Sequence, residues 1–369
     1  MKLFPDLEKR YSADSMSALS AQRLAHEISF GPVVFQVSRL MVKFGILQML
    51  VDSPSGLTLD EVAQKAQLSR YAAQVLLESS LTAGTVLCRE GRFEASKAGW
   101  FLLNDPLVKV NMNFNHDVNY LGWFKLDEAL LGGKPEGLKT FGSWSTIYEG
   151  LSSLPEQARK SWLEFDHFYS DSSFDEALKI VFARPLRTVL DVGGNTGRWA
   201  LRCVGYNPDV KVTVMDLPQQ LELMQAQVSG AAGADRIFGY EVNLLDREAP
   251  FPSGFEAIWM SQLLDCFSED EATNILARAA AAMSSDASLF IMETFWDRQR
   301  FEAAAYCLTQ ISLYFTALAN GNSKMYHSDD MVRCVEAAGL TVAKTYDGLG
   351  KGHSILMCKK KQASTNEQL

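Results

Sequence analysis

The sequence predicts an α/β protein in which a doubly wound, mainly parallel sheet follows a mostly α-helical domain. Two observations favour this fold class. From Arg187 onward, short apolar runs alternate with helical segments, which is typical of parallel strands joined by crossover helices. Before Arg187, apolar residues recur at helical spacing over long stretches. At 369 residues the chain is also long for a single core, so we expect more than one domain.

Residues 1–104 are predicted to form a winged-helix domain. Apolar positions at helical spacing between residues 17 and 50 are followed by two short amphipathic helices and by two short strands around the turn REGR. Thr58 and Ser69 mark the starts of the short helices. The helix that would read DNA carries a single Arg and a single Glu, too little positive charge to follow a phosphate backbone. The pattern therefore favours an interaction or dimerisation domain over a DNA-binding one.

Residues 105–185 are predicted to be a helical linker that contributes to a ligand pocket. The segment is rich in aromatic side chains, which either pack in a core or roof such a pocket. These side chains are Phe114, Tyr120, Trp123, Phe124, Trp144, Tyr148, Trp162, Phe165, Phe168 and Tyr169.

Residues 186–360 are predicted to form the sheet domain, and residues 361–369 a disordered tail. The expected strands are RTVLDV, KVTVMD, EAIWMS, SLFIME, TVAKTY and HSILMC. The first four of them end at or near Asp191, Asp216, Ser261 and Glu293. Ligands of such sheets bind at the carboxyl ends of the strands, so this polar row predicts the binding edge.

The composition argues against several classes of partner. A net charge of -9 and a pI ≈ 5.2 do not suit a nucleic-acid or anionic-membrane surface, because both need clustered Lys and Arg. The six cysteines show neither CxxC nor zinc-ligand spacing, so we expect reduced thiols and no metal site. With neither a signal-peptide pattern nor a long apolar run in the sequence, we expect a soluble, cytoplasmic protein.

The stretch TVLDVGGNTGRWA carries the most information about function. A strand runs into Gly193, Gly194 and Gly197 and then into a helix, so a ligand can approach the backbone closely. The next strand ends at Asp216, where a carboxylate can accept hydrogen bonds from both hydroxyls of a ribose. A dinucleotide fingerprint would need further glycines where the chain has Asn195 and Arg198. The pattern thus favours a nucleoside ligand other than NAD.

These features resemble the class I S-adenosylmethionine-dependent methyltransferases, in particular the small-molecule O-methyltransferases with an N-terminal winged-helix dimerisation domain. The resemblance spans nearly the whole chain and is carried by LTLDEVAQKAQLSRYAAQVLLESSLTAGTV, LDVGGNTG, MDLPQQ and CVEAAGL. It implies a seven-stranded, Rossmann-like methyltransferase sheet with S-adenosyl-L-methionine as co-substrate and no metal. It also implies a homodimer formed through the N-terminal domains.

The resemblance implies where the methyl donor binds. Asp191, Gly193 and Gly194 would lie against its methionine part, Asp216 would hold the ribose, and Leu217 would contact the adenine.

Three positions of this donor site differ from common family members. Asn195 stands where Gly is frequent, and Asn tolerates left-handed backbone angles better than most residues. Asn243 replaces an Asp near the adenine amine, and its amide oxygen can accept the same hydrogen bond. Ser261 replaces a Lys of many plant members. Gly197 and Leu244 complete the predicted donor site.

The predicted catalytic position departs from the family further. Members commonly have Leu-His-Asp-Trp there, with the His as general base, whereas residues 264–267 are Leu-Asp-Cys-Phe. Asp265 therefore stands in place of the base. Glu293 matches the first of two family Glu residues that orient that His, and the second falls at Lys324 or Met325.

Several roles for this site remain open at the level of sequence. Asp265 can be a base if burial and a neighbouring carboxylate such as Glu293 raise its pKa, or it can orient a hydroxyl beside a ring carbon that is methylated. His116 or His167 can supply the base from the aromatic helical segment instead. Asp265 can also be a loop carboxylate without a chemical role.

The predicted function is transfer of a methyl group from S-adenosylmethionine to a small, aromatic acceptor at oxygen or ring carbon. The apolar segment 301–321 is predicted to line the acceptor pocket or to pack in the core. One alternative is a methyltransferase-fold protein that binds the donor and catalyses other chemistry. A less favoured one is a winged-helix transcriptional regulator.

Overall fold

The computed structural model of the chain describes residues 5–361 and shows two compact units. One unit is Ser12–Val118, and the other begins at Asn119 and includes the segment that ends at Tyr11. The predicted tail, 361–369, lies outside the described residues apart from Lys361. No helix in the described part of the chain is both long and apolar enough to cross a membrane.

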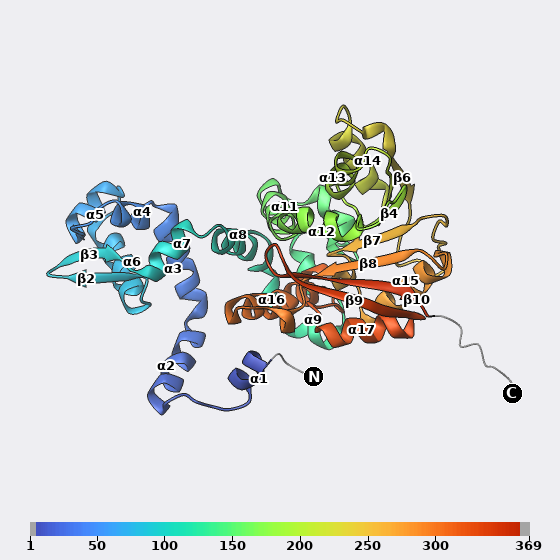
Figure 1. Ribbon diagram of the computed structural model, residues 1–369. Helices are drawn as coiled ribbons and strands as arrows, with labels where there is room; N and C mark the ends of the chain where they lie inside the picture. Colours follow the sequence, from blue (N-terminus) through green and yellow to red (C-terminus); the bar gives the residue numbers. More distant parts are fainter. Residues whose placement is uncertain (1–4, 362–369) are drawn as a thin grey trace. The chain divides into compact units, whose positions relative to one another are not determined.

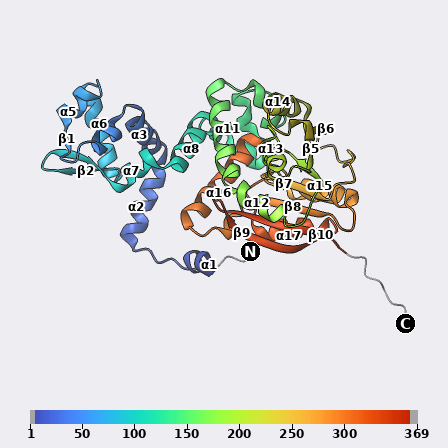
Figure 2. The ribbon, with the colours of Figure 1, turned by 45° about the horizontal axis from the view of Figure 1, so that its top comes forward.

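The first unit has the helices and the small sheet that the winged-helix pattern predicts. Its helices are α2 (Ala18–Ser29), α3 (Gly31–Lys43), α4 (Ile46–Val51), α5 (Leu59–Lys65), α6 (Arg70–Thr82), α7 (Lys97–Asn104) and α8 (Pro106–Phe114). Its strands β1 (Leu57–Thr58), β2 (Val86–Arg89) and β3 (Arg92–Ala95) form an antiparallel sheet in the order β1-β3-β2. Figures 1 and 2 show this unit in blue and teal.

Local capping explains where the helices of this unit start. The Thr58 hydroxyl accepts the Glu61 N–H while the Glu61 carboxylate accepts the Thr58 N–H, which is a capping box for α5. The Ser69 hydroxyl caps α6 by accepting the Ala72 N–H at 3.1 Å. Both predicted helix starts are confirmed.

The second unit is built on a seven-stranded sheet in the order β6-β5-β4-β7-β8-β10-β9. Its strands are β4 (Thr188–Val192), β5 (Lys211–Asp216), β6 (Ile237–Glu241), β7 (Ala257–Ser261), β8 (Ser288–Glu293), β9 (Leu340–Leu349) and β10 (His353–Lys360). All pairings are parallel except those of β10 with β8 and β9. The six predicted strands are present, and β6 is an additional one at the edge.

Helices cover both faces of this sheet, as the doubly wound prediction requires. On one face pack α12 (Phe174–Val181), α13 (Arg198–Tyr206) and α14 (Pro218–Val228), and on the other α15 (Glu269–Ala282) and α17 (Ser328–Ala337). Figures 1 and 2 show α17 beside β9 and β10. The central strands are buried on both faces because side chains alternate between these two cores.

The remaining helices of this unit precede the sheet in sequence, except the last, which lies between β8 and β9. They are α1 (Pro5–Tyr11), α9 (Leu126–Gly132), α10 (Ile147–Gly150), α11 (Glu156–Ser170) and α16 (Glu302–Tyr314). The π-helical turn Phe315–Ala319 continues α16. Residues of α10, α11 and α16 reach the carboxyl ends of the strands, where they line a cavity.

Candidate active site

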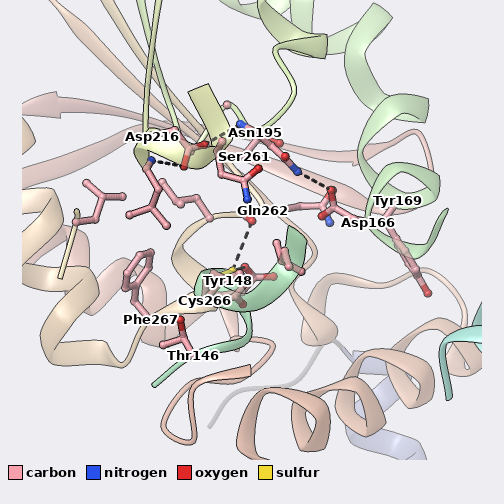
Figure 3. Close-up of a pocket in the computed structure, with 18 of the residues that line it drawn as sticks. Thr146, Tyr148, Asp166, Tyr169, Asn195, Asp216, Ser261, Gln262, Cys266 and Phe267 are labelled. Atoms are coloured by element: carbon pink, nitrogen blue, oxygen red, sulfur yellow. Dashed lines mark hydrogen bonds between the residues drawn. The ribbon is translucent and has the colours of Figure 1, made fainter. Parts of the chain in front are cut away.

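A cavity of about 290 Å³ opens at the carboxyl edge of the sheet. It is lined by the turns after β4, β5, β7 and β8 together with residues of α11 and α16 (Figure 3). The lining includes nine of the ten residues predicted to hold the donor: Asp191, Gly193, Gly194, Asn195, Asp216, Leu217, Asn243, Leu244 and Ser261. Gly197, the tenth, does not line it.

The glycine turn after β4 has a backbone that few other residues would adopt. Gly193 has φ +70 and donates its N–H to the Met215 carbonyl at 2.8 Å. A Cβ on Gly194 would lie 2.5 Å from Oδ2 of Asp191. The left-handed backbone that Asn195 was expected to tolerate is present, with φ +49. These angles bring the turn close to the cavity without obstructing side chains.

Gly197 belongs to the same turn but lies outside the cavity wall. Its φ is +77, and a Cβ there would come within 2.8 Å of Met224 Cγ on α14. The absence of a side chain therefore lets α13 begin close against α14. The structure therefore gives Gly197 a packing position and not a place in the cavity wall.

Asp216 closes the turn from the next strand. Its carboxylate accepts the Asn195 N–H at 2.8 Å and the Leu217 N–H at 2.7 Å (Figure 3). Burial raises the pKa of Asp216, and the two N–H donors counteract that shift. The carboxylate is thus oriented beside the cavity, where it can accept hydrogen bonds from a ribose.

Asp191 is a buried carboxyl group that lacks a partner within the described residues. It is 2% exposed, and its Oδ2 accepts no hydrogen bond. Burial, and then the charge of Asp216, raise the pKa of Asp191 to about 8. Ser261 Oγ, which also belongs to a lining residue, is buried without a partner as well. An orphaned carboxyl and hydroxyl beside the glycine turn fit the ammonium and polar atoms of S-adenosylmethionine.

Asp265 lies in a 3-10 turn, Leu264–Cys266, and faces the same cavity. It is 5% exposed, and burial raises its pKa to about 7. The Cys266 thiol, 3.5 Å from Oδ1, lowers that pKa, and the Asp166 carboxylate raises it. The carboxyl of Asp265 therefore titrates close to neutral pH, far above the ordinary value of an Asp.

Glu293 holds the turn that carries Asp265. Its Oε1 accepts the N–H groups of Leu263 at 3.1 Å and Leu264 at 2.9 Å, and its Oε2 is buried without a partner. Burial, and then the charge of Asp265, raise the pKa of Glu293 well above its usual range. The carboxyl groups of Asp265 and Glu293 interact, as we expected, and the Asp166 carboxylate on α11 also raises the pKa of Asp265.

The two histidines considered as alternative bases occupy different places. His167 lines the cavity, and burial followed by the Arg198 charge lowers its pKa. His116 belongs to the first compact unit, where its Nδ1 is 2.8 Å from Oδ1 of Asp117, and it is not among the lining residues. Asp265 and His167 thus line the same cavity as the predicted donor-site residues, whereas His116 does not.

Aromatic and apolar side chains form the rest of the wall. Trp162 on α11 donates its indole N–H to the Tyr314 hydroxyl on α16 at 2.7 Å. The α16 segment contributes Leu308, Ile311, Tyr314 and Phe315, as predicted for a pocket helix. Of the ten aromatic residues expected to pack or to roof a pocket, the lining contains Tyr148, Trp162, Phe165 and Tyr169.

Sequence patterns did not single out Asp166, Gln262 or Thr294 as pocket residues. Asp166 lies among aromatic residues on α11, and these neighbours were the one signal that the sequence offered. Gln262 and Thr294 directly follow β7 and β8, so their places at strand ends could have drawn attention to them.

Comparisons with known proteins agree with this geometry. A model of the O-methyltransferase domain matches residues 123–340, which is more than half of the chain. The chain belongs to this O-methyltransferase family. A model of the Dimerisation2-like domain matches residues 22–93. The protein is an S-adenosylmethionine-dependent methyltransferase, as the donor-site residues predicted.

Similar curated proteins include methyltransferases of two kinds. The chain is 22% identical over 303 residues to L-tyrosine C(3)-methyltransferase of Streptomyces lavendulae, and the aligned region covers 81% of this chain and 81% of the relative. It is 24% identical over 322 residues to demethylspheroidene O-methyltransferase of Rhodobacter capsulatus, covering 85% of this chain and 76% of the relative.

Solved structures share the fold. The S-adenosylmethionine-dependent methyltransferase SibL in its apo form matches with TM-score 0.69 and 22% identity, covering 91% of this chain and 98% of that one. Human N-acetylserotonin methyltransferase in complex with S-adenosylmethionine matches with TM-score 0.63 and 18% identity, covering 95% of this chain and 100% of that one.

Proposed function

We propose that this methyltransferase acts on a small, hydroxylated aromatic acceptor, at oxygen or at a ring carbon next to it, with Asp265 as the base. One observation carries the proposal: Asp265 is buried, has a pKa raised to about 7, and faces the cavity lined by the donor-site residues. A base whose pKa lies near the working pH is suited to proton transfer.

The donor and the chain contribute different parts of the reaction. When bound, S-adenosylmethionine would supply the methyl group of its sulfonium: the carbon–sulfur bond breaks as the acceptor bonds to the methyl carbon, and the sulfur leaves as the neutral thioether of S-adenosylhomocysteine. The Asp265 carboxylate takes the proton of the acceptor hydroxyl onto an Oδ atom. The electron pair left on the acceptor is shared between its oxygen and its ortho ring carbons, so both are nucleophilic. After methylation at carbon, that carbon loses its hydrogen to water as a proton and the oxygen takes back the proton held by Asp265, so one proton is released in either case.

The wall of the cavity supports an aromatic acceptor. Trp162, Tyr148, Phe165, Tyr314 and Phe315 present ring faces and edges on which a flat ligand can pack. These side chains also keep water from the reacting atoms, which strengthens every electrostatic contact within the cavity. Relatives named for tyrosine C(3) and for naphthoate O-methylation are consistent with an aromatic acceptor and with either acceptor atom.

The first test is binding of the donor and its product, followed by product analysis. Calorimetry should show that both S-adenosylmethionine and S-adenosylhomocysteine bind. Incubation with S-adenosylmethionine and a panel of phenols, catechols and hydroxynaphthoates should give a product heavier by one CH2, and NMR would locate the new methyl group. Binding of neither nucleoside at millimolar concentration would refute the proposal.

We also propose that the protein forms a homodimer through its N-terminal unit. Helix α2 has no buried residue although it carries large apolar side chains. Leu19 is 78% exposed and Ile28 is 70% exposed, and just beyond the end of the helix Phe30 is 61% exposed. Apolar side chains of this size on a helix that buries none of them call for a partner surface. The Dimerisation2-like match, residues 22–93, includes Ile28 and Phe30.

Replacement of Ile28 by Glu should convert the dimer to a monomer, measured by size-exclusion chromatography with light scattering. Gln36→Glu on α3 adds the same charge at a partly exposed polar position and serves as the control. A monomeric wild-type protein would contradict the proposal.

A further inference from the structure

Gln262 follows β7 directly and precedes the turn that carries Asp265. Its backbone has φ +47, in the left-handed region that residues other than Gly, Asn and Asp rarely adopt. Such strain concentrates at functional sites, where the surrounding structure maintains it. Figure 3 shows Gln262 among the residues of the cavity, near Ser261 and Cys266. The fold thus holds Gln262 at the cavity in a backbone conformation that its sequence alone disfavours.

A buried hydrogen-bond chain fixes the side-chain amide of Gln262. His353, the first residue of β10, has no exposed surface. Its Nδ1 lies 2.8 Å from the Ser173 hydroxyl, and its Nε2 lies 3.3 Å from Oε1 of Gln262. Burial lowers the pKa of His353 to about 3, so the ring is neutral at neutral pH and carries one N–H.

The distances indicate the direction in which hydrogen bonds are donated from Ser173 through His353 to Gln262. The Ser173 hydroxyl can donate to His353 Nδ1 at 2.8 Å or to the Leu349 carbonyl at 3.4 Å, and the shorter bond is the better one. With Nδ1 as acceptor, the proton of the neutral ring is on Nε2, which donates to Oε1 of Gln262. The amide nitrogen of Gln262 is then the end of the chain, and it bonds no other described residue.

We propose that the Gln262 amide N–H donates a hydrogen bond to the acceptor oxygen and stabilises it as the phenolate, with His353 and Ser173 as positioning residues. The proposal rests on the proposed function, in which Asp265 removes the hydroxyl proton. Oriented N–H donors in a site shielded from water stabilise developing negative charge strongly. The bond matters here because a phenol titrates near 10 while Asp265 titrates at about 7. Stabilising the phenolate reduces the difference between the pKa of the acceptor hydroxyl and that of Asp265, whether oxygen or ring carbon receives the methyl group.

The experiment uses 4-nitrophenol, whose phenolate absorbs visible light, bound to the protein loaded with S-adenosylhomocysteine. The pKa of bound nitrophenol should lie below its value in solution. Gln262→Met keeps a similar side-chain length without N–H donors, and it should raise the bound pKa by about one unit, which is tenfold in acidity. Gln227→Met, at an exposed position of α14, should leave that pKa unchanged.

A second measurement tests the positioning chain in the unmutated protein. Long-range 1H–15N correlation spectra should show His353 as the neutral tautomer with its proton on Nε2, unchanged between pH 6 and 8. A proton on Nδ1 would overturn the proposal, because the amide of Gln262 would then be oriented with its nitrogen toward His353.

The outcomes separate this proposal from the proposed function. If S-adenosylhomocysteine does not bind, the proposed function fails. If it binds and bound nitrophenol has the same pKa in wild type and Gln262→Met, the role of Gln262 alone is refuted.

Discussion

Binding of S-adenosylhomocysteine at pH 7 is expected to release nearly one proton from Asp191. With a pKa of about 8, the free protein holds about 0.9 proton on this carboxyl at pH 7. The ligand ammonium would pair with the ionised form and return its pKa toward the ordinary Asp value, so about 0.9 proton leaves. The release should fall to about 0.1 proton at pH 9, where Asp191 is already ionised.

The assay is calorimetry in phosphate and Tris buffers, which differ in ionisation enthalpy. The slope of the observed enthalpy against the buffer enthalpy gives the number of protons released. Asp191→Asn should abolish this release and weaken binding by about 10- to 100-fold, the worth of one charge-assisted hydrogen bond. Equal proton release in the two proteins would refute the pairing of Asp191 with the ligand ammonium.

Instability of the variant would not explain weaker binding. The folded-state pKa of Asp191 is raised above the unfolded value, so its contribution to stability is fully present below about pH 4 and is lost as pH rises through about 8. Asp191→Asn carries no charge at any pH. The variant should therefore be no less stable than the wild type at pH 8, and thermal unfolding checks this.

Two further predictions concern the base and the glycine turn. Asp265→Asn should lower kcat by about 10²- to 10⁴-fold and leave the affinity for S-adenosylhomocysteine unchanged. The kcat/KM of the wild type should rise with pH up to about 7, and this rise should be absent in the variant. An unchanged kcat would assign the base elsewhere. Gly197→Ala should destabilise the protein by about 1–3 kcal/mol, because φ is +77 and the new Cβ meets Met224. Gly205→Ala in the same helix meets no atom within 4 Å and should stabilise by about 0.5–1 kcal/mol, so denaturant unfolding of the pair tests the argument.

The features that sequence could predict are those with local or periodic causes. Strands β4, β7 and β8 are buried on both faces, so they appear as continuous apolar runs. The start of α15 was predictable because Ser268 and Glu271 form a capping box within four residues. The edge strand β6 was not predicted because it is half exposed and contains Gly239, which weakens the strand pattern.

Contacts between distant segments of the chain could not be predicted in the same way. The chain from Ser173 through His353 to Gln262 joins residues 180 and 91 positions apart. Asp166, whose carboxylate also raises the pKa of Asp265, comes from a helix before the sheet, and the family pattern did not point to it. The sequence could place a carboxyl at the catalytic position, but its acidity depends on packing that only the folded protein provides.

Asp in place of the family's His at the proposed catalytic position has a physical reason in this cavity. Burial disfavours the charged form of any group, so it lowers the pKa of an imidazole and raises that of a carboxyl. Both effects are present in this protein, because burial lowers the pKa of His353 to about 3 and raises that of Asp265 to about 7. A His in a site this dry would need paired carboxylates to keep its basicity, and the second of the family Glu positions is Lys324 or Met325 here. Asp265 needs no such partner, since the desolvation that would weaken a histidine base brings the carboxyl into the working range.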